Sequence, residues 1–123
     1  MHRGVRSVVA AALVVAGSLL VYADVTTPSH AGDVQLRLAH EFFGEGRFND
    51  ALDAYQRALR ANPPADRRAA RSGLVQSALR VAEFSTARAE AETLLAESPE
   101  DPSALALYAD ALWASGLFEE AEG

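Results

Sequence analysis

The side chains that could carry out nucleophilic or metal chemistry are few in this chain of 123 residues. There is no cysteine, which excludes a thiolate nucleophile, a disulfide and a thiolate metal site. His40 could belong to a Ser-His-Asp arrangement, but no glycine-flanked serine elbow or oxyanion loop accompanies it. His30 lies in a short polar run, and a metal site needs several converging donors. We therefore predict no catalytic residue, no metal ligand and no cofactor site, and interpret His40 as a helix-surface histidine.

Acidic residues are clustered in two places. A calcium-binding loop alternates its oxygen ligands around a central glycine, and neither cluster has that spacing. No glycine-rich phosphate-binding run occurs in the sequence. We interpret both clusters as solvated helix faces. They consist of Glu90, Glu92, Glu97, Glu100 and Asp101, and of Glu119, Glu120 and Glu122.

The charge balance argues against nucleic acid as a partner. The formal net charge is −6, and nonspecific affinity for nucleic acid comes mainly from cations that contact phosphate. The arginines nevertheless gather around one predicted turn, which we interpret as a solvated surface. The alternative is that this cluster receives an acidic partner or anionic headgroups. The cluster consists of Arg57, Arg60, Arg67, Arg68 and Arg71.

These residues must be positioned by helices, and the clearest helix signals lie in residues 46–63. Gly46 is suited to end one helix, and Asn49 is a plausible cap for the next. Pro63 ends that second helix, because proline lacks the amide and biases the preceding residue away from helix. Residues on one face recur at the helical period, with alanines that allow close approach of a neighbouring helix. They are Ala51, Tyr55, Ala58 and Leu59.

Similar signals recur on both sides of this stretch. A preceding helix is predicted to begin near Asp33, and a following one at Ala65 or Asp66, with Gly73 permitting a close backbone contact. Residues 84–99 then repeat the opening stretch, with Ser85 as the predicted cap. A further helix opens with Asp101 and Pro102, a cap followed by the one helical position where proline is favoured.

The combined pattern resembles the tetratricopeptide repeat, a helical hairpin of about 34 residues. The interval from Ala51 to Ala87 is 36 residues and that from Ala87 to Ala121 is 34, which places a two-residue insertion around residues 64–67. In the second copy, Ala82 replaces the turn glycine. Counted from Gly32, seven residues match the small, aromatic and proline positions of the family: Ala39, Phe42, Phe48, Ala51, Tyr55, Ala58 and Pro63.

The resemblance implies an all-α fold, an α-solenoid of antiparallel helix hairpins with about two and a half repeats. Their predicted boundaries are 32–65, a degenerate 68–101 and a truncated 102–123. Gln35 and Arg71 stand where the family usually has tryptophan or leucine, which predicts looser packing at the hairpin entrances.

The resemblance also implies where a ligand would bind, because the concave groove of such solenoids is lined by first-helix residues. The lysines and asparagines that clamp C-terminal carboxylates in chaperone-tail binders are missing here, which disfavours that ligand. The remaining side chains suit an extended or helical peptide, with packing on the next repeat as the alternative. The groove candidates are Leu36, His40, Phe43, Gln76, Leu79, Arg80, Asp110 and Trp113.

Residues 1–23 differ in kind from the rest. Arg3 and Arg6 precede an apolar run at residues 8–21, and small residues follow, which predicts a secretory signal peptide. A membrane span needs about 20 apolar residues, so cleavage is favoured over an uncleaved anchor. In both cases the arginines stay on the cytoplasmic side. Residues 24–32 have the composition of a linker.

We therefore expect a bacterial, non-enzymatic scaffold that is periplasmic or secreted, or else anchored in the inner membrane and facing the periplasm. It would bind a protein or peptide, and contact a membrane only through residues 1–23. The alternative is the N-terminal module of a longer periplasmic enzyme, such as a peptidase, whose active site lies beyond residue 123. The inner face of the first helix in the third repeat is predicted to consist of Leu105, Tyr108, Ala109 and Leu112. The incomplete third repeat is expected to leave another apolar face of this helix exposed, which would pair with a more C-terminal helix or with another copy.

Overall fold

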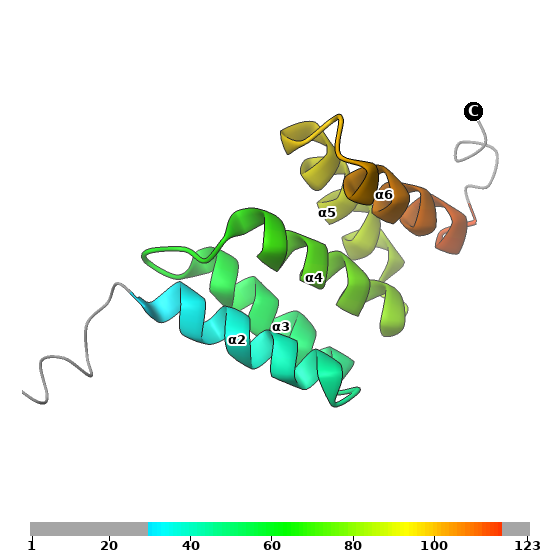
Figure 1. Ribbon diagram of the computed structural model, residues 1–123. Helices are drawn as coiled ribbons and strands as arrows, with labels where there is room; N and C mark the ends of the chain where they lie inside the picture. The colour runs from blue at the N-terminus through cyan, green and yellow to red at the C-terminus, as the bar shows by residue number, and fades with distance from the viewer. Residues whose placement is uncertain (1–29, 117–123) are drawn as a thin grey trace, which may run out of the picture.

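The computed structural model describes residues 30–116, and these form five α-helices and no strand (Figure 1). The predicted all-α solenoid is confirmed. The predicted signal segment and the residues after Gly116 lie outside the described range, and no helix within 30–116 is long and apolar enough to span a membrane. The helices are α2 (Ala31–Gly44), α3 (Phe48–Arg60), α4 (Arg67–Arg80), α5 (Phe84–Glu97) and α6 (Pro102–Ala114).

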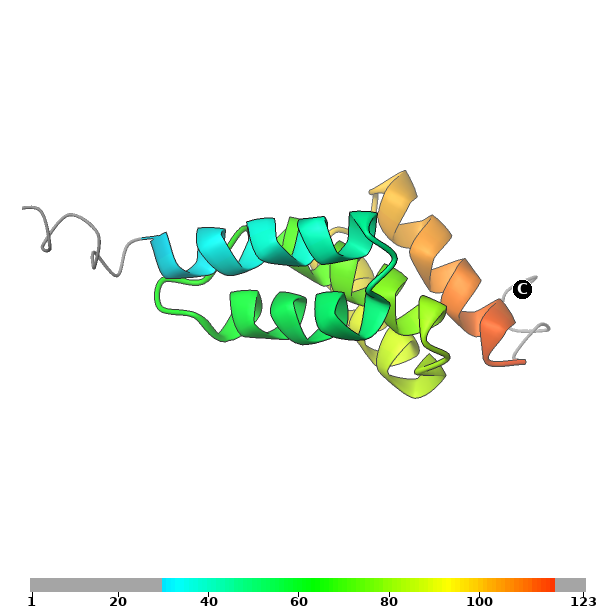
Figure 2. The same cartoon turned by 90° about the horizontal axis from the view of Figure 1, so that it is seen from below.

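Successive helices pack against each other as antiparallel neighbours. Helices α2 and α3 form the first hairpin, α4 and α5 form the second, and α6 continues the stack (Figures 1 and 2). The first helices of the repeats also touch one another, since α4 contacts both α2 and α6. By contrast, α3 and α5 do not contact each other anywhere in the described chain. The first helices therefore form a continuous layer, and the second helices stand apart on the other side.

Alanine dominates the core because the helices approach closely. Ala39, Ala51 and Ala87 are completely buried, as the repeat spacing predicts. Tyr55 supplies the largest buried ring, and it lies directly over Gly73 of α4. A Cβ atom at Gly73 would lie 2.2 Å from the Cζ atom of Tyr55, which real contacts do not allow. The predicted close contact at Gly73 therefore exists, and its partner is an aromatic side chain rather than another backbone.

The two hairpin turns have the same geometry although only one of them uses glycine. Gly46 has a φ of 76°, and the Arg47 amide donates to the Phe42 carbonyl over 2.9 Å. Ala82 has a φ of 62°, and the amide that follows it donates to the Ala78 carbonyl over 2.9 Å. This bond, donated by the second residue beyond the C-cap, is that of the Schellman ending. The predicted replacement of glycine by Ala82 thus leaves an alanine in the left-handed region.

Two predicted side-chain caps are wrong. Asn49 and Ser85 lie inside α3 and α5, whose caps are Arg47 and Glu83. The backbone carbonyl of each cap residue accepts the first helical hydrogen bond, but neither side chain accepts one. The geometry of the turn explains where these helices begin. Only one residue separates the left-handed Gly46 or Ala82 from the first residue of the following helix. Each helix therefore begins with its phenylalanine, two residues too early for the polar side chain to cap it. Helix α2 likewise begins at Ala31 and places Asp33 in its first turn.

Both helices that open after an inter-repeat connection have an aspartate cap, of which Asp101 was predicted as a cap and Asp66 only as a possible first residue of its helix. Asp66 caps α4 by accepting from the Ala69 amide over 3.2 Å, and Asp101 caps α6 by accepting from the Ser103 amide over 3.0 Å. The connection from α3 to α4 has six residues and that from α5 to α6 has four. The extra two residues lie within 61–66, close to where the interval between the alanines places them.

Candidate protein-binding face

The predicted groove residues lie on α2, α4 and α6, the three helices that form the continuous layer. We call them together the first-helix face. Spacings of three and four residues bring side chains to the same side of a helix. The face comprises Leu36, His40 and Phe43 on α2, Gln76, Leu79 and Arg80 on α4, and Asp110 and Trp113 on α6.

These residues divide into two groups by burial. Leu36, Phe43 and Leu79 are half-buried and pack against the core, so they stabilise the stack as well as bordering the face. The other five are exposed. Trp113 is the most accessible large apolar side chain of the described residues, with 61% of its surface exposed, so it is not a core residue. The exposed group consists of His40, Gln76, Arg80, Asp110 and Trp113.

His40 is joined to the core through Tyr55. Its Nδ1 atom lies 2.7 Å from the Tyr55 hydroxyl, and the two rings meet edge to face with centroids 5.4 Å apart. Burial of the Tyr55 ring raises the pKa of its hydroxyl above the ordinary value of 10.0. The sequence interpretation of His40 as a surface histidine is therefore incomplete. This hydrogen bond satisfies the only polar atom of a buried ring, and the two residues are fifteen positions apart, which no local pattern reveals.

An arginine lies over an aromatic pair between the first two repeats. The rings of Phe43 and Phe48 meet edge to face at 5.1 Å, and the Arg80 guanidinium lies 5.2 Å from the Phe48 centroid. A cation at this distance is attracted to the ring, which keeps it at the surface without neutralising its charge. No carboxylate of the described chain forms an ion pair with Arg80. Its N–H groups therefore remain available to a partner at the edge of the first-helix face.

The predicted inner face of α6 is only partly correct. Leu112 is buried and Tyr108 is half-buried, because both face the layers formed by α4 and α5. Leu105 and Ala109, predicted to face inward, are exposed, and 50% of the Leu105 surface is accessible. Together with Trp113 they recur every four residues and form one apolar ridge along the helix, which borders the first-helix face.

Most of the arginine cluster is engaged within the protein. The Nε atom of Arg57 donates to the Gln35 Oε1 atom over 3.1 Å, and Arg68 pairs with the Asp101 carboxylate at the start of α6. The latter hydrogen bond, followed by that from the Ser103 amide, lowers the pKa of Asp101. The prediction that Asp101 is only a solvated acid is therefore wrong. The cluster is largely a set of bridges between helices and not a free cationic surface.

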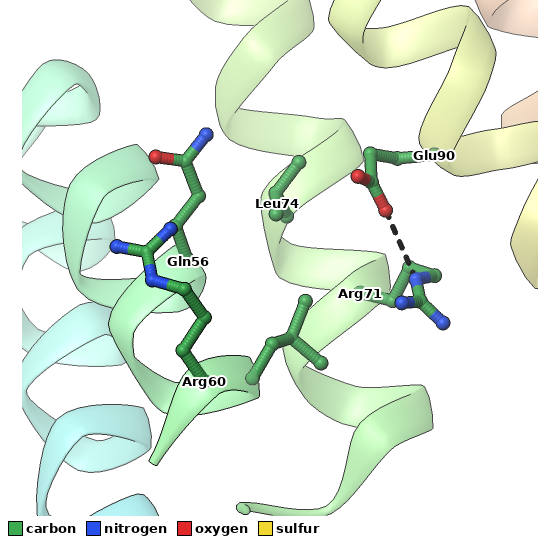
Figure 3. A pocket seen from close by; sticks show the side chains of 6 residues that line it. Gln56, Arg60, Arg71, Leu74 and Glu90 are labelled. Carbon is green, nitrogen blue, oxygen red and sulfur yellow. Dashed lines mark hydrogen bonds and ion pairs between the residues drawn. The ribbon is translucent and has the colours of Figure 1, made fainter.

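Arg71 makes the most buried of these bridges. Its Nε atom lies 3.0 Å from the Glu90 carboxylate (Figure 3). Its Nη1 atom lies 2.7 Å from the Glu97 carboxylate, and only 16% of the Arg71 side chain is exposed. Gln35 and Arg71 were expected to loosen the packing at the hairpin entrances. Instead, each side chain connects the first helix of its repeat to the second. Glu90 and Glu97 are accordingly structural partners and not merely solvated. Among residues 30–116, no group of three histidines and acids is placed to hold a metal ion.

Comparison with known proteins agrees with this architecture. A family model described as tetratricopeptide repeat matches residues 36–74 and 72–123, which together cover most of the chain. Neither the curated proteins nor the solved structures compared with it gave a match. Repeats of this kind typically bind protein or peptide partners on the surface formed by stacked hairpins. The family match, the helix order and the two Schellman turns together show that the chain belongs to the tetratricopeptide repeat family.

Proposed function

We propose that this protein is an exported, non-catalytic scaffold that binds an extended or helical peptide segment of another protein on its first-helix face. The observation that carries the proposal is the exposure of Trp113 beside a row of polar side chains on the same layer of helices. Interfaces are enriched in tryptophan and arginine because a large ring excludes water around neighbouring polar contacts.

The polar side chains suit a peptide rather than a purely apolar partner. His40, Gln76 and Asp110 occupy the corresponding position of three successive first helices, and all three are exposed. They offer hydrogen-bonding groups along the layer, while Arg80 offers a cation over Phe48. A peptide backbone needs partners for its amides and carbonyls, and apolar side chains need a surface such as the Trp113 ring. The first-helix face therefore offers polar side chains to the backbone of a peptide and the Trp113 ring to its apolar side chains.

Export is supported by the N-terminal sequence alone. Two arginines precede an apolar run whose length fits a signal peptide better than a membrane span. The proposed location is the periplasm or the exterior of a bacterium. N-terminal sequencing of the protein recovered from outside the cytoplasm tests cleavage, since an intact Met1 excludes it. Recovery of the whole protein in the cytoplasm would contradict export itself.

The binding proposal is tested by photo-crosslinking in the native host followed by affinity measurement. A crosslinker placed at Asp110 should capture a partner, and one placed at the exposed Glu92 on α5 should not. Trp113→Ala should then weaken binding of the purified partner by about tenfold or more, the effect of losing an interface anchor. Phe84→Ala is the matched control, because Phe84 is also an exposed aromatic but lies on α5.

Helicity distinguishes binding from folding in this experiment. Trp113→Ala should leave the circular dichroism spectrum unchanged, since exposed substitutions usually alter stability by less than about 0.5 kcal/mol. Equal affinities for Trp113→Ala and Phe84→Ala would refute the first-helix face as the binding surface. Joint loss of helicity and affinity would show that Trp113 supports the fold.

A further inference from the structure

A hollow lies where α3 and α5 stand apart. Its volume is about 340 Å³, and α4 forms its base, because the second helices of the two repeats do not contact each other. We call it the outer hollow. Figure 3 shows its walls, with α3 on one side and the Arg71–Glu90 pair on the other. It is lined by Gln56, Leu59, Arg60, Arg71, Leu74 and Glu90.

The outer hollow is separate from the first-helix face. Arg71 and Arg80 are both on α4 but nine residues apart, which at about 100° per residue places them on opposite sides of the helix. The hollow therefore opens on the side of the second helices, and neither Trp113 nor Arg80 lines it. A ligand in the hollow would leave the first-helix face accessible.

The base of the outer hollow is apolar and its two walls have opposite charge. Leu59 is half-buried and supplies the accessible apolar surface at the bottom, while Leu74 lies beneath it with only 1% of its surface exposed. On the α3 wall, Arg60 is exposed beside Gln56, and no carboxylate of residues 30–116 pairs with it. On the far wall, one arginine is bound by two glutamates, which leaves one net negative charge at Glu90 and its neighbours.

This distribution selects among ligands. Nucleic acid and anionic headgroups fit poorly, because the acidic wall would repel a run of phosphates. The volume is near the lower end of the roughly 300–1,000 Å³ typical of small-molecule sites, so it admits a few side chains. A complementary ligand has an anionic group for Arg60, an apolar group for Leu59 and Leu74, and a cationic group for Glu90.

We propose that the outer hollow is a second binding site, which takes a segment of a partner protein in which an apolar side chain lies between an acidic and a basic one. The acidic side chain pairs with the Arg60 guanidinium and accepts a hydrogen bond from the Gln56 amide. The apolar side chain packs on Leu59 above the buried Leu74, and the basic side chain approaches the Glu90 carboxylate. Charge complementarity on both walls fixes the orientation of the segment.

The test uses the full chain and two fluorescein-labelled peptides. Each peptide has a leucine between a glutamate and a lysine, set in glycine and serine, with the charged pair in one order or the other. Fluorescence anisotropy should show saturable binding of at least one peptide. Arg60→Gln should weaken it by about fivefold, the effect of losing one partly exposed ion pair. Arg67→Gln is the matched control, because Arg67 belongs to the same cluster but does not line the hollow.

A double-mutant cycle locates the contact. Replacing the glutamate of the peptide by glutamine should weaken binding to the wild type, but should have little further effect on Arg60→Gln. Additive losses, equal weakening by Arg67→Gln, or no saturable binding of either peptide would each overturn the proposal. Trp113→Ala should leave peptide affinity unchanged, so this result is independent of the first-helix face. Weakening by Trp113→Ala alone would assign the peptide to that face and overturn the outer hollow as its site.

Discussion

Replacing Ala82 by glycine is expected to stabilise the protein, although glycine usually destabilises helical proteins. Ala82 follows the end of α4 with a φ of 62°, in the left-handed region that Gly46 occupies in the first hairpin with a φ of 76°. The turn is held there by the hydrogen bond from the next amide to the Ala78 carbonyl, 2.9 Å long. The alanine therefore adopts an unfavourable conformation that the backbone bonds of the turn require.

The magnitude follows from two opposing effects. A side chain with a Cβ atom loses roughly 1–2 kcal/mol in the left-handed region, which glycine at position 82 would recover. Glycine also increases the conformational entropy of the unfolded chain, which opposes folding by about 0.5–1 kcal/mol. Ala82 is exposed, so its methyl group contributes little burial. The net expectation for Ala82→Gly is a gain of about 0.5–1 kcal/mol, a rise in Tm of roughly 2–8 °C for a domain of this size.

Urea and thermal unfolding followed by circular dichroism measure this difference. Ala89→Gly is the matched control, because Ala89 is also an exposed alanine but lies inside α5, where glycine should destabilise by about 1 kcal/mol. Gly46→Ala should destabilise by a similar amount, since its Cβ would meet no neighbour but would be strained by the positive φ. Ala82→Gly should thus raise the unfolding midpoint, and Ala89→Gly should lower it. Equal destabilisation by Ala82→Gly and Ala89→Gly would refute the assignment of strain to Ala82.

Three further predictions concern the contacts between helices. Gly73→Ala should destabilise the protein by about 1–3 kcal/mol in urea unfolding, because its Cβ would overlap the Tyr55 ring; an unchanged midpoint would contradict the close packing. Burial raises the pKa of Tyr55, so the unfolded state releases the hydroxyl proton at lower pH than the folded state does. Stability should therefore fall as pH rises above about 10, and Tyr55→Phe should abolish this fall. Arg71→Ala should destabilise the protein by about 1–3 kcal/mol, more than Arg57→Ala does, because its loss leaves two carboxylates without their partner. Equal unfolding midpoints for the two variants would show that the Arg71 ion pairs contribute nothing to stability.

The sequence predicted the helices and their packing because both depend on periodicity. Small residues at a fixed interval, such as Ala51 and Ala87, identify the faces where helices meet, and both are fully buried. Asp101 was also predicted as a cap, since it stands directly before a proline at the first helical position. The start of the preceding first helix was predicted at Ala65 or Asp66, next to its actual cap Asp66. These features are local in the chain, or repeat at the family period, and so can be found from residue types alone.

Features that depend on distant pairs could not be predicted. Arg71 was expected to weaken its hairpin because it replaces an apolar residue, yet Glu90 and Glu97 approach it from the next helix. The bond between His40 and Tyr55 likewise joins two helices. Helical spacing gives the direction of each side chain but not the partner that it meets. Two residues of the predicted inner face of α6, Leu105 and Ala109, are exposed for the same reason, because the orientation of this helix depends on α4 and α5.

The position shared by Gln35, Arg71 and Leu105 shows how one repeat position can serve different roles. In the first two repeats it is polar and reaches the second helix of its own hairpin through Arg57 or through two glutamates. In the third it is a leucine with half of its surface exposed on the α6 ridge. A polar bridge determines which second helix fits, because a buried arginine needs its carboxylates. An apolar ridge does not require a particular charged partner. The α6 ridge can therefore pack against a wider range of helices than the polar bridges of the first two repeats allow.

Helix α4 connects the two proposed binding surfaces. It carries Gln76 and Arg80 towards the first-helix face and Arg71 and Leu74 towards the outer hollow. Its position relative to the first repeat depends on the contact between Gly73 and Tyr55. A substitution that shifts α4, such as Gly73→Ala, should therefore weaken both proposed sites together. Arg60 lies on α3 and Trp113 on α6, and these two helices contact α4 but not each other. Because stacked repeats interact mainly with nearest neighbours, a substitution at either residue should weaken only one of the two sites.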